Sequence, residues 1–190
     1  MHPGLALRVN TSKFAKVIVN WCFILRYFLS LQACASHMNK AEKAVANRAC
    51  QVLAESQASR NTTSTSSADQ PFRILSIGCG DGTFDARILQ AMFSKYPDIK
   101  IHYTGIDIDK EVCEKAREEL GTLKANHEVE IKMFAMSFED IDSIKAEISP
   151  CDLVLAVHVF YYMKDFKKAL TDAQALTKPG HGKAIFVIIY

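Results

Sequence analysis

The sequence lacks three features that would place it in a specialised class of protein. No run of about 18 residues is both apolar and uncharged, which excludes an unambiguous membrane span but leaves weaker membrane association open. The formal net charge of +2 gives no overall signal for nucleic acid. None of the six cysteines has Cys-x-x-Cys spacing or a histidine cluster beside it, so neither a metal site nor a disulfide framework is indicated. We expect reduced thiols in a cytoplasmic protein.

What the sequence does contain is ordinary globular composition. Of the 190 residues, 49% are apolar and 23% are charged. This length suffices for one hydrophobic core with an extension, rather than for two independent domains. We divide the chain into an amino-terminal helical extension (residues 1–55), a linker (residues 56–70) and one larger domain (residues 71–190).

The first zone has two interpretations. Its apolar side chains recur at helical spacing, as at Phe14, Val17, Trp21, Leu25 and Phe28. A second helix is expected from about Ser36 through Leu53. However, no acidic residue precedes Glu42, and Ala33-Cys34-Ala35 has the small-x-small form of a signal-peptidase site. Residues 1–35 are therefore either a packed amphipathic helix or a targeting or anchor segment.

The second zone is rich in serine and threonine. It contains the run Asn61-Thr-Thr-Ser-Thr-Ser-Ser67. Few of its side chains can be buried to offset the entropy that ordering costs, so the composition predicts a flexible linker.

The third zone alternates strand and helix patterns. Runs rich in Ile, Val and Phe predict strands at residues 72–77, 101–106, 129–134, 152–159 and 183–189. Helical patterns lie between them at residues 84–95, 110–120, 142–147 and 165–176. This alternation is typical of an α/β fold, with a parallel sheet covered by helices on both faces.

A glycine-rich loop follows the first predicted strand, in Ile74-Leu75-Ser76-Ile77-Gly78-Cys79-Gly80-Asp81-Gly82. Glycines let the backbone turn sharply toward a ligand, and amides at a helix start offer hydrogen-bond donors. A nicotinamide dinucleotide is not indicated, because the third glycine of its fingerprint would fall at Thr83. The loop resembles the GxGxG loop of class I S-adenosylmethionine-dependent methyltransferases. That resemblance implies a Rossmann-like fold and cofactor contacts at Gly78, Cys79, Gly80 and Gly82.

Two further segments fit the same resemblance. Asp107 ends the second predicted strand, where a carboxylate can accept hydrogen bonds from both ribose hydroxyls, while Asp109 is better placed to cap the next helix. After the third predicted strand, Ser137 and Phe138 take the place that lines the adenine in these enzymes. Phe138 is equally suited to the hydrophobic core.

The fourth predicted strand ends near His158, Tyr161 and Tyr162. Ligands bind beyond the carboxyl ends of the strands in open α/β sheets, so these side chains are expected to face the methyl donor. His158 is the candidate catalytic base for an amine acceptor, although a histidine at a strand end is commonly structural. Tyr161 and Tyr162 are candidate substrate contacts that could equally serve packing.

Within the superfamily, residues 71–190 resemble the histamine N-methyltransferase family. The likeness rests on Leu75-Ser76-Ile77-Gly78, where many relatives have an acidic residue in place of Ser76, on Tyr96-Pro97, and on Tyr161-Tyr162-Met163-Lys164-Asp165. A fainter likeness covers residues 26–37, which resemble that family's substrate-covering helix. The resemblance implies donor contacts at Gly78, Asp107, Val112, Ser137 and Val157.

Three departures weaken the histamine part of this resemblance. The family's substrate-binding Glu has no counterpart near Ala35, Ser36 and His37, and His158 stands where the family has Gln. The sequence also stops after the fifth predicted strand, where the family continues. We therefore expect either methyl transfer from S-adenosylmethionine to a small molecule such as an amine, or a truncated, non-catalytic module that binds the methyl donor.

Overall fold

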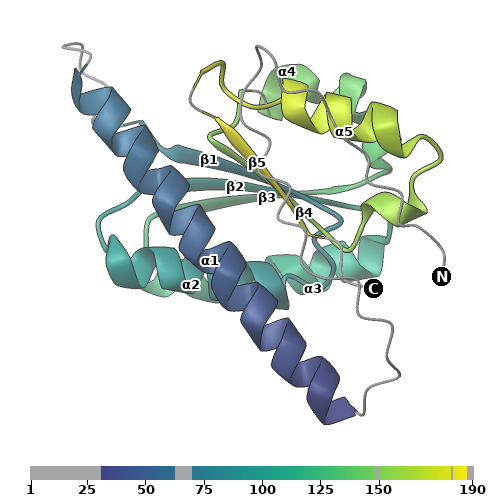
Figure 1. Ribbon diagram of the computed structural model, residues 1–190, viewed down its shortest axis with the longest axis horizontal. Helices are drawn as coiled ribbons and strands as arrows, with labels where there is room; N and C mark the ends of the chain where they lie inside the picture. The colour runs from purple at the N-terminus through teal and green to yellow at the C-terminus, as the bar shows by residue number, and fades with distance from the viewer. Residues whose placement is uncertain (1–30, 63–69, 149, 181, 188–190) are drawn as a thin grey trace, which may run out of the picture.

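A single parallel sheet forms the centre of the molecule in a computed structural model, which describes residues 31–62, 70–148, 150–180 and 182–187 (Figure 1). Its strands are β1 (Phe72–Ile77), β2 (Ile101–Asp107), β3 (Val129–Ala135), β4 (Leu153–Val157) and β5 (Lys183–Val187). They lie in the order β3-β2-β1-β4-β5, and each neighbouring pair is parallel. The predicted Rossmann-like sheet is thus confirmed.

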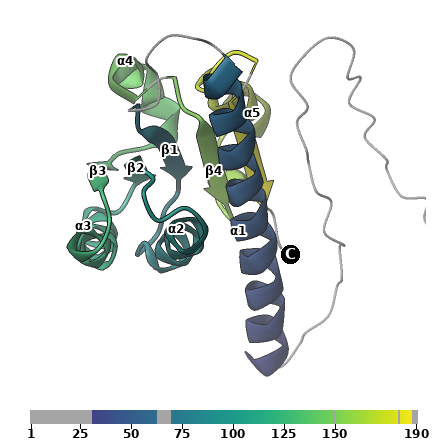
Figure 2. The same cartoon turned by 90° about the vertical axis from the view of Figure 1, so that its left-hand side faces the viewer.

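Helices cover both faces of this sheet (Figure 2). One face carries α1 (Leu31–Thr62), α2 (Thr83–Lys95) and α3 (Lys110–Gly121), the last followed by a 3₁₀ turn, η2 (Thr122–Ala125). The other carries α4 (Lys145–Ile148), α5 (Phe166–Ala175) and the 3₁₀ turns η3 (Phe138–Ser143) and η4 (Phe160–Tyr162). The sheet is therefore the middle layer of three.

Alternate residues of the central strands feed two separate hydrophobic cores. Ile74 and Leu155 pack with α1, α2 and α3, whereas Leu75 and Val154 pack with α5 and the turns around η3 and η4. Successive side chains of a strand point to opposite faces, so a strand covered on both sides reads as an unbroken apolar run. This is why the strands were predictable from the sequence.

The beginning of the predicted linker is helical. α1 continues to Thr62, so residues 56–62 belong to a helix rather than to the flexible segment expected at residues 56–70. The reason is a polar side chain that is buried: Ser56 is 5% exposed, and its hydroxyl donates to Asp152 Oδ1 at 3.2 Å. Val45, Ala49 and Leu53 precede it on the same face and join the first core, so α1 and the sheet share one core.

Several smaller differences separate the predicted from the observed elements. β4 ends at Val157 rather than at residue 159, because His158 leaves the extended conformation with a φ of 56°. The helix predicted at residues 142–147 is divided between η3 and α4. Asp109 caps α3 as predicted, since its carboxylate accepts from the amides of Glu111 and Val112.

Some expectations fall outside the described residues. The helix or targeting segment predicted before residue 31, the middle of the predicted linker and the last three residues belong to this group. Across the described ranges, no helix combines the length and the apolar character needed to cross a bilayer. The four cysteines there, Cys50, Cys79, Cys113 and Cys151, are free thiols.

Candidate functional site

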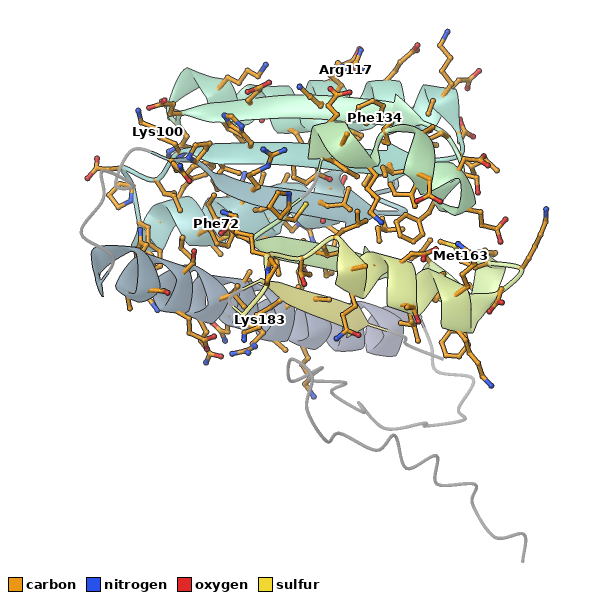
Figure 3. All side chains as sticks on the ribbon, turned by 90° about the horizontal axis from the view of Figure 1, so that it is seen from above. Phe72, Lys100, Arg117, Phe134, Met163 and Lys183 are labelled. Carbon is orange, nitrogen blue, oxygen red and sulfur yellow. The ribbon has the colours of Figure 1, made fainter. Side chains whose placement is uncertain are left out.

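A cavity of about 460 Å³ opens at the carboxyl ends of the strands. Its walls come from the ends of β1 and β2 and from the residues that follow β3 and β4. Six of the residues predicted from the sequence line it: Gly78, Asp107, Ser137, Phe138, His158 and Tyr162. Figure 3 labels Met163, another lining residue, at this end of the sheet and Lys100 at the opposite end. The fold thus brings together residues that are up to 84 positions apart (162 − 78).

Gly78 begins the loop between β1 and α2 and has a φ of 66°. A Cβ atom built there would lie 2.5 Å from Val159 Cγ2, so this position excludes every larger residue both by conformation and by space. The amide of Gly78 donates to the carbonyl of Ile106 at 2.7 Å, which joins the loop to the end of β2.

The other residues of the loop do not line the cavity. Gly82 starts α2 with a φ of 80°, and a Cβ there would lie 2.9 Å from Ala116 Cα, so this glycine permits the close packing of α3. Cys79 is buried, and burial raises the pKa of its thiol. Gly80 does not line the cavity either, although no atom lies within 4 Å of the position of its missing side chain.

The Asp107 carboxylate is fixed by two backbone amides. Gly80 N donates to Oδ2 at 3.0 Å, and Asp109 N donates to Oδ1 at 3.1 Å. Each carboxylate oxygen has a further lone pair, so the group can accept two more hydrogen bonds from a ligand. Since Asp109 provides the helix cap, Asp107 has no capping duty.

Ser137 and Phe138 form the wall after β3. The Ser137 hydroxyl oxygen accepts from the amide of Glu139 at 3.2 Å, which leaves the hydroxyl proton available to a ligand. Phe138 is 4% exposed and belongs to the second core, yet it also lines the cavity. Phe138 therefore belongs to the core and lines the cavity at once, and its contact with the adenine stays a prediction.

His158 lies on the wall after β4. Its φ of 56° is unusual for a residue with a side chain, and its Nε2 atom is buried with no hydrogen-bond partner. Burial lowers the pKa of the imidazole from its ordinary value of 6.5, so the ring is neutral at pH 7. A buried polar atom without a partner carries an energetic cost.

The mouth of the cavity is apolar and aromatic. Ile108 and Tyr162 are both 79% exposed, and the Tyr161 ring lies 4.4 Å from the Tyr162 ring, measured between centroids. Tyr162 lines the cavity, whereas Tyr161 does not.

Two predicted donor contacts lie elsewhere. Val112 is in the first turn of α3, where its amide donates to Asp109 Oδ1, and Val157 pairs with Val187 inside the sheet. Neither residue lines the cavity.

The sequence matches a family of methyltransferase domains over residues 75–181. The chain belongs to this family. The predicted class I S-adenosylmethionine-dependent methyltransferase, with S-adenosylmethionine as its cofactor, is confirmed at the level of family and fold. The resemblance to histamine N-methyltransferases is not part of what the family match shows.

The chain is similar to several solved methyltransferase structures, and the one with a TM-score above 0.5 supports the fold. The carbon methyltransferase DszA is 19% identical, with a TM-score of 0.53, over 73% of this chain and 34% of that one. The arsenic(III) S-adenosylmethionine methyltransferase of Chlamydomonas reinhardtii is 23% identical, with a TM-score of 0.47 and coverage of 60% and 38%. A Geobacter sulfurreducens methyltransferase in complex with S-adenosyl-L-homocysteine is 16% identical, with a TM-score of 0.45 and coverage of 61% and 41%. The present chain thus spans well under half the length of each. No curated protein matches the sequence.

The cavity of this methyltransferase domain has the size of a cofactor site. Its volume falls in the range of about 300–1,000 Å³ that is usual for sites of small ligands and cofactors. Asp107, which lines it, retains acceptor capacity for a ligand. His158 adds an imidazole to the wall.

Sequence reasoning missed several lining residues, among them Ile108, Glu139, Val159 and Met163. Glu139 is the one with chemistry: its Oε1 accepts from the amide of Lys164 at 2.9 Å, and its side chain is 33% exposed. A single acidic residue after a motif resembles any solvated side chain, so the sequence held no signal that would separate Glu139 from its neighbours.

Proposed function

We propose that this chain holds S-adenosylmethionine in the cavity at the carboxyl ends of the strands and transfers its methyl group to a small molecule, with an amine nitrogen as the acceptor atom. The observation that carries the proposal is that His158 lines the same cavity as Gly78 and Asp107. One cavity thus combines residues suited to the donor with a proton acceptor.

The residues for the donor divide by chemistry. Asp107 is held by two amides and would accept the two ribose hydroxyls. The backbone around Gly78 and Gly80 leaves room for the methionine part, while Phe138 and Ser137 offer an apolar surface and a hydroxyl for the adenine. Bound there, the sulfonium supplies a methyl group that is already electrophilic.

The protein then needs to align a neutral nucleophile with that methyl group. An amine attacks through its lone pair: the nitrogen–carbon bond forms as the carbon–sulfur bond breaks, and the nitrogen loses a proton. His158 is neutral because burial lowers its pKa, so it can accept this proton, directly or through water. Positioning supplies most of the remaining rate.

The mouth of the cavity supports an amine acceptor. Glu139 places a carboxylate on the wall. The exposed Tyr162 ring offers a π-face to the protonated amine, before the amine loses its proton and attacks. Histamine and related amines are the first acceptors to test, because Tyr161 and Tyr162 stand in the segment that resembles the histamine N-methyltransferase family.

The test is transfer of labelled methyl from S-adenosylmethionine to a panel of amines, thiols and phenols. We expect turnover with an amine, and a loss of about 100-fold in kcat for His158→Asn, a replacement that tolerates the left-handed backbone. The affinity for S-adenosylhomocysteine should stay within about threefold, since the donor contacts are unchanged.

His102→Asn is the matched control, because His102 is a half-buried residue of β2 that pairs with Glu130 outside the cavity. In the wild type, kcat/KM should rise with pH as His158 and the amine each lose a proton. In His158→Asn, the contribution of His158 below its ordinary value of 6.5 should disappear, while the rise caused by deprotonation of the amine remains. Turnover of thiols or phenols alone would contradict the amine assignment, and donor binding without any turnover would favour the non-catalytic alternative.

A further inference from the structure

A buried polar cluster lies directly behind the glycine loop, outside the cavity. It consists of Ser76, Asp85 and Tyr103, which are 3%, 2% and 1% exposed. The Ser76 hydroxyl donates to Asp85 Oδ2 at 2.8 Å, and the Tyr103 hydroxyl donates to the same oxygen at 2.7 Å. The proposed reaction uses none of these groups, so it does not explain why they are buried in the core.

The cluster is costly. A carboxyl group in the core loses its hydration, and this desolvation raises the pKa of Asp85 to about 6. Its hydrogen-bond partners within the described part of the chain are two neutral hydroxyls. Hydrogen bonds from the two hydroxyls offset part of this desolvation cost, but an apolar side chain at position 85 would not incur the cost at all.

The three residues come from β1 and α2, which flank the glycine loop, and from β2, which ends at Asp107. Ser76 lies in β1, two residues before Gly78; Asp85 lies in the first turn of α2, three residues after Gly82; and Tyr103 lies in β2, four residues before Asp107. Residues four apart in a strand share a face, so Tyr103 and Asp107 lie on the same side of the sheet. Asp85 therefore ties the start of α2 to both strands whose ends form the site.

The loop needs such an attachment. Gly78, Gly80 and Gly82 all have positive φ, and a segment with this much glycine loses more entropy on ordering than other sequences. The amides of Gly78 and Gly80 already tie the first part of the loop to the end of β2. At the other end of the loop, Asp81 accepts from the amide of Thr83 within the loop itself, and Asp85 links the first turn of α2 to the strands.

We propose that Asp85 is a positioning residue for the methyl donor. Through Ser76 and Tyr103 it fixes the first turn of α2 against β1 and β2, and thereby holds the Gly78–Gly82 loop in the conformation that admits the donor beside Asp107. This inference rests on the proposed function, because it presumes that the cavity binds S-adenosylmethionine.

The test is calorimetric titration of the folded protein with S-adenosylhomocysteine. Asp85→Ala removes the acceptor of both hydroxyls and should weaken binding at least about tenfold. Asp85→Asn should restore binding to within about threefold of the wild type, because its amide oxygen can accept from both hydroxyls. Tyr103→Phe, which removes one donor and keeps the ring, should lie between them and serves where Asp85→Ala does not fold.

Asp152→Asn is the control for stability alone. Asp152 is also 2% exposed and hydrogen-bonded, but it lies at the start of β4, away from the loop. It should lower the midpoint of thermal unfolding and leave donor affinity unchanged. Folded Asp85→Ala or Tyr103→Phe with wild-type affinity, or an equal loss of affinity in Asp152→Asn, would overturn the inference. Absence of binding by the wild type would instead refute the proposed function.

Discussion

The two ends of the sheet each bury one carboxylate, and they treat it differently. Asp152, at the amino end, is 2% exposed and accepts from Lys178 Nζ at 2.8 Å and from the amide of Arg73 at 2.9 Å. Asp85, toward the carboxyl end, is equally buried but accepts from hydroxyls. The first carboxylate is neutralised by a cation, whereas burial raises the pKa of the second to about 6.

This difference suggests that the amino end of the sheet serves stability and the carboxyl end serves ligand binding. At the amino end the buried carboxylate is used to join elements of the fold. Asp152, just before β4, accepts from the Ser56 hydroxyl of α1 and from the Arg73 amide at the start of β1. The carboxyl end holds groups whose hydrogen-bonding capacity is not exhausted within the described residues, chiefly Asp107 and His158 Nε2. Substitutions at the first end should change stability, and those at the second should change ligand binding.

The largest expected effect on stability is at Asp152. Asp152→Asn leaves the Lys178 ammonium, whose side chain is only 24% exposed, without its counter-charge. We expect a loss of about 3 kcal/mol in the free energy of unfolding, measured by urea denaturation. The affinity of the folded protein for S-adenosylhomocysteine should not change; a change of more than about tenfold would show that the two ends are coupled.

The next effect concerns two glycines with positive φ, one at each end. Gly78→Ala puts a Cβ 2.5 Å from Val159 Cγ2, so the loop must move and donor binding should fall by about 100-fold or more. Gly180→Ala, with a φ of 78° but no atom within 4 Å, should cost only about 1 kcal/mol of strain and leave binding intact. Equal effects of the two substitutions on donor affinity would contradict the assignment of ligand binding to the carboxyl end alone.

A smaller effect is the pH dependence that Asp85 gives to stability. Its pKa is higher in the folded state, about 6, than its ordinary value of 3.8, so its contribution favours folding at low pH and is lost as the pH rises through about 6. Asp85→Asn lacks this dependence. Relative to the wild type, it should gain about 1–1.5 kcal/mol between pH 5 and pH 7.5 in urea denaturation. A constant difference would mean that Asp85 does not titrate in this range.

The sequence was informative where local chemistry decides the structure. Buried strands read as apolar runs, and the glycines at 78, 80 and 82 mark backbone that turns with positive φ, so the sheet and the loop were placed correctly. Asp109 was placed correctly as the cap of α3, and the role of Asp107 toward the ribose stays a prediction.

What could not be predicted depends on contacts between distant residues. Ser76 drew notice as a departure from the usual acidic residue, but its partner Asp85 is nine residues away and Tyr103 eighteen residues beyond that. The positive φ of His158 has no signal in a run of apolar neighbours. The extension of α1 to Thr62 could not be predicted either, because Ser56 is hydrogen-bonded to Asp152, which lies 96 positions later in the sequence.

The most direct test of the central claim is a calorimetric titration of the 190-residue protein with S-adenosylhomocysteine, beside Asp107→Ala and Asp109→Ala. The two carboxylates lie at the same strand end, but Asp107 lines the cavity while Asp109 caps α3. We predict micromolar binding by the wild type, a loss of about 100-fold for Asp107→Ala, and unchanged affinity with about 1 kcal/mol less stability for Asp109→Ala. Wild-type affinity in folded Asp107→Ala, or no binding by the folded wild type, would contradict the account.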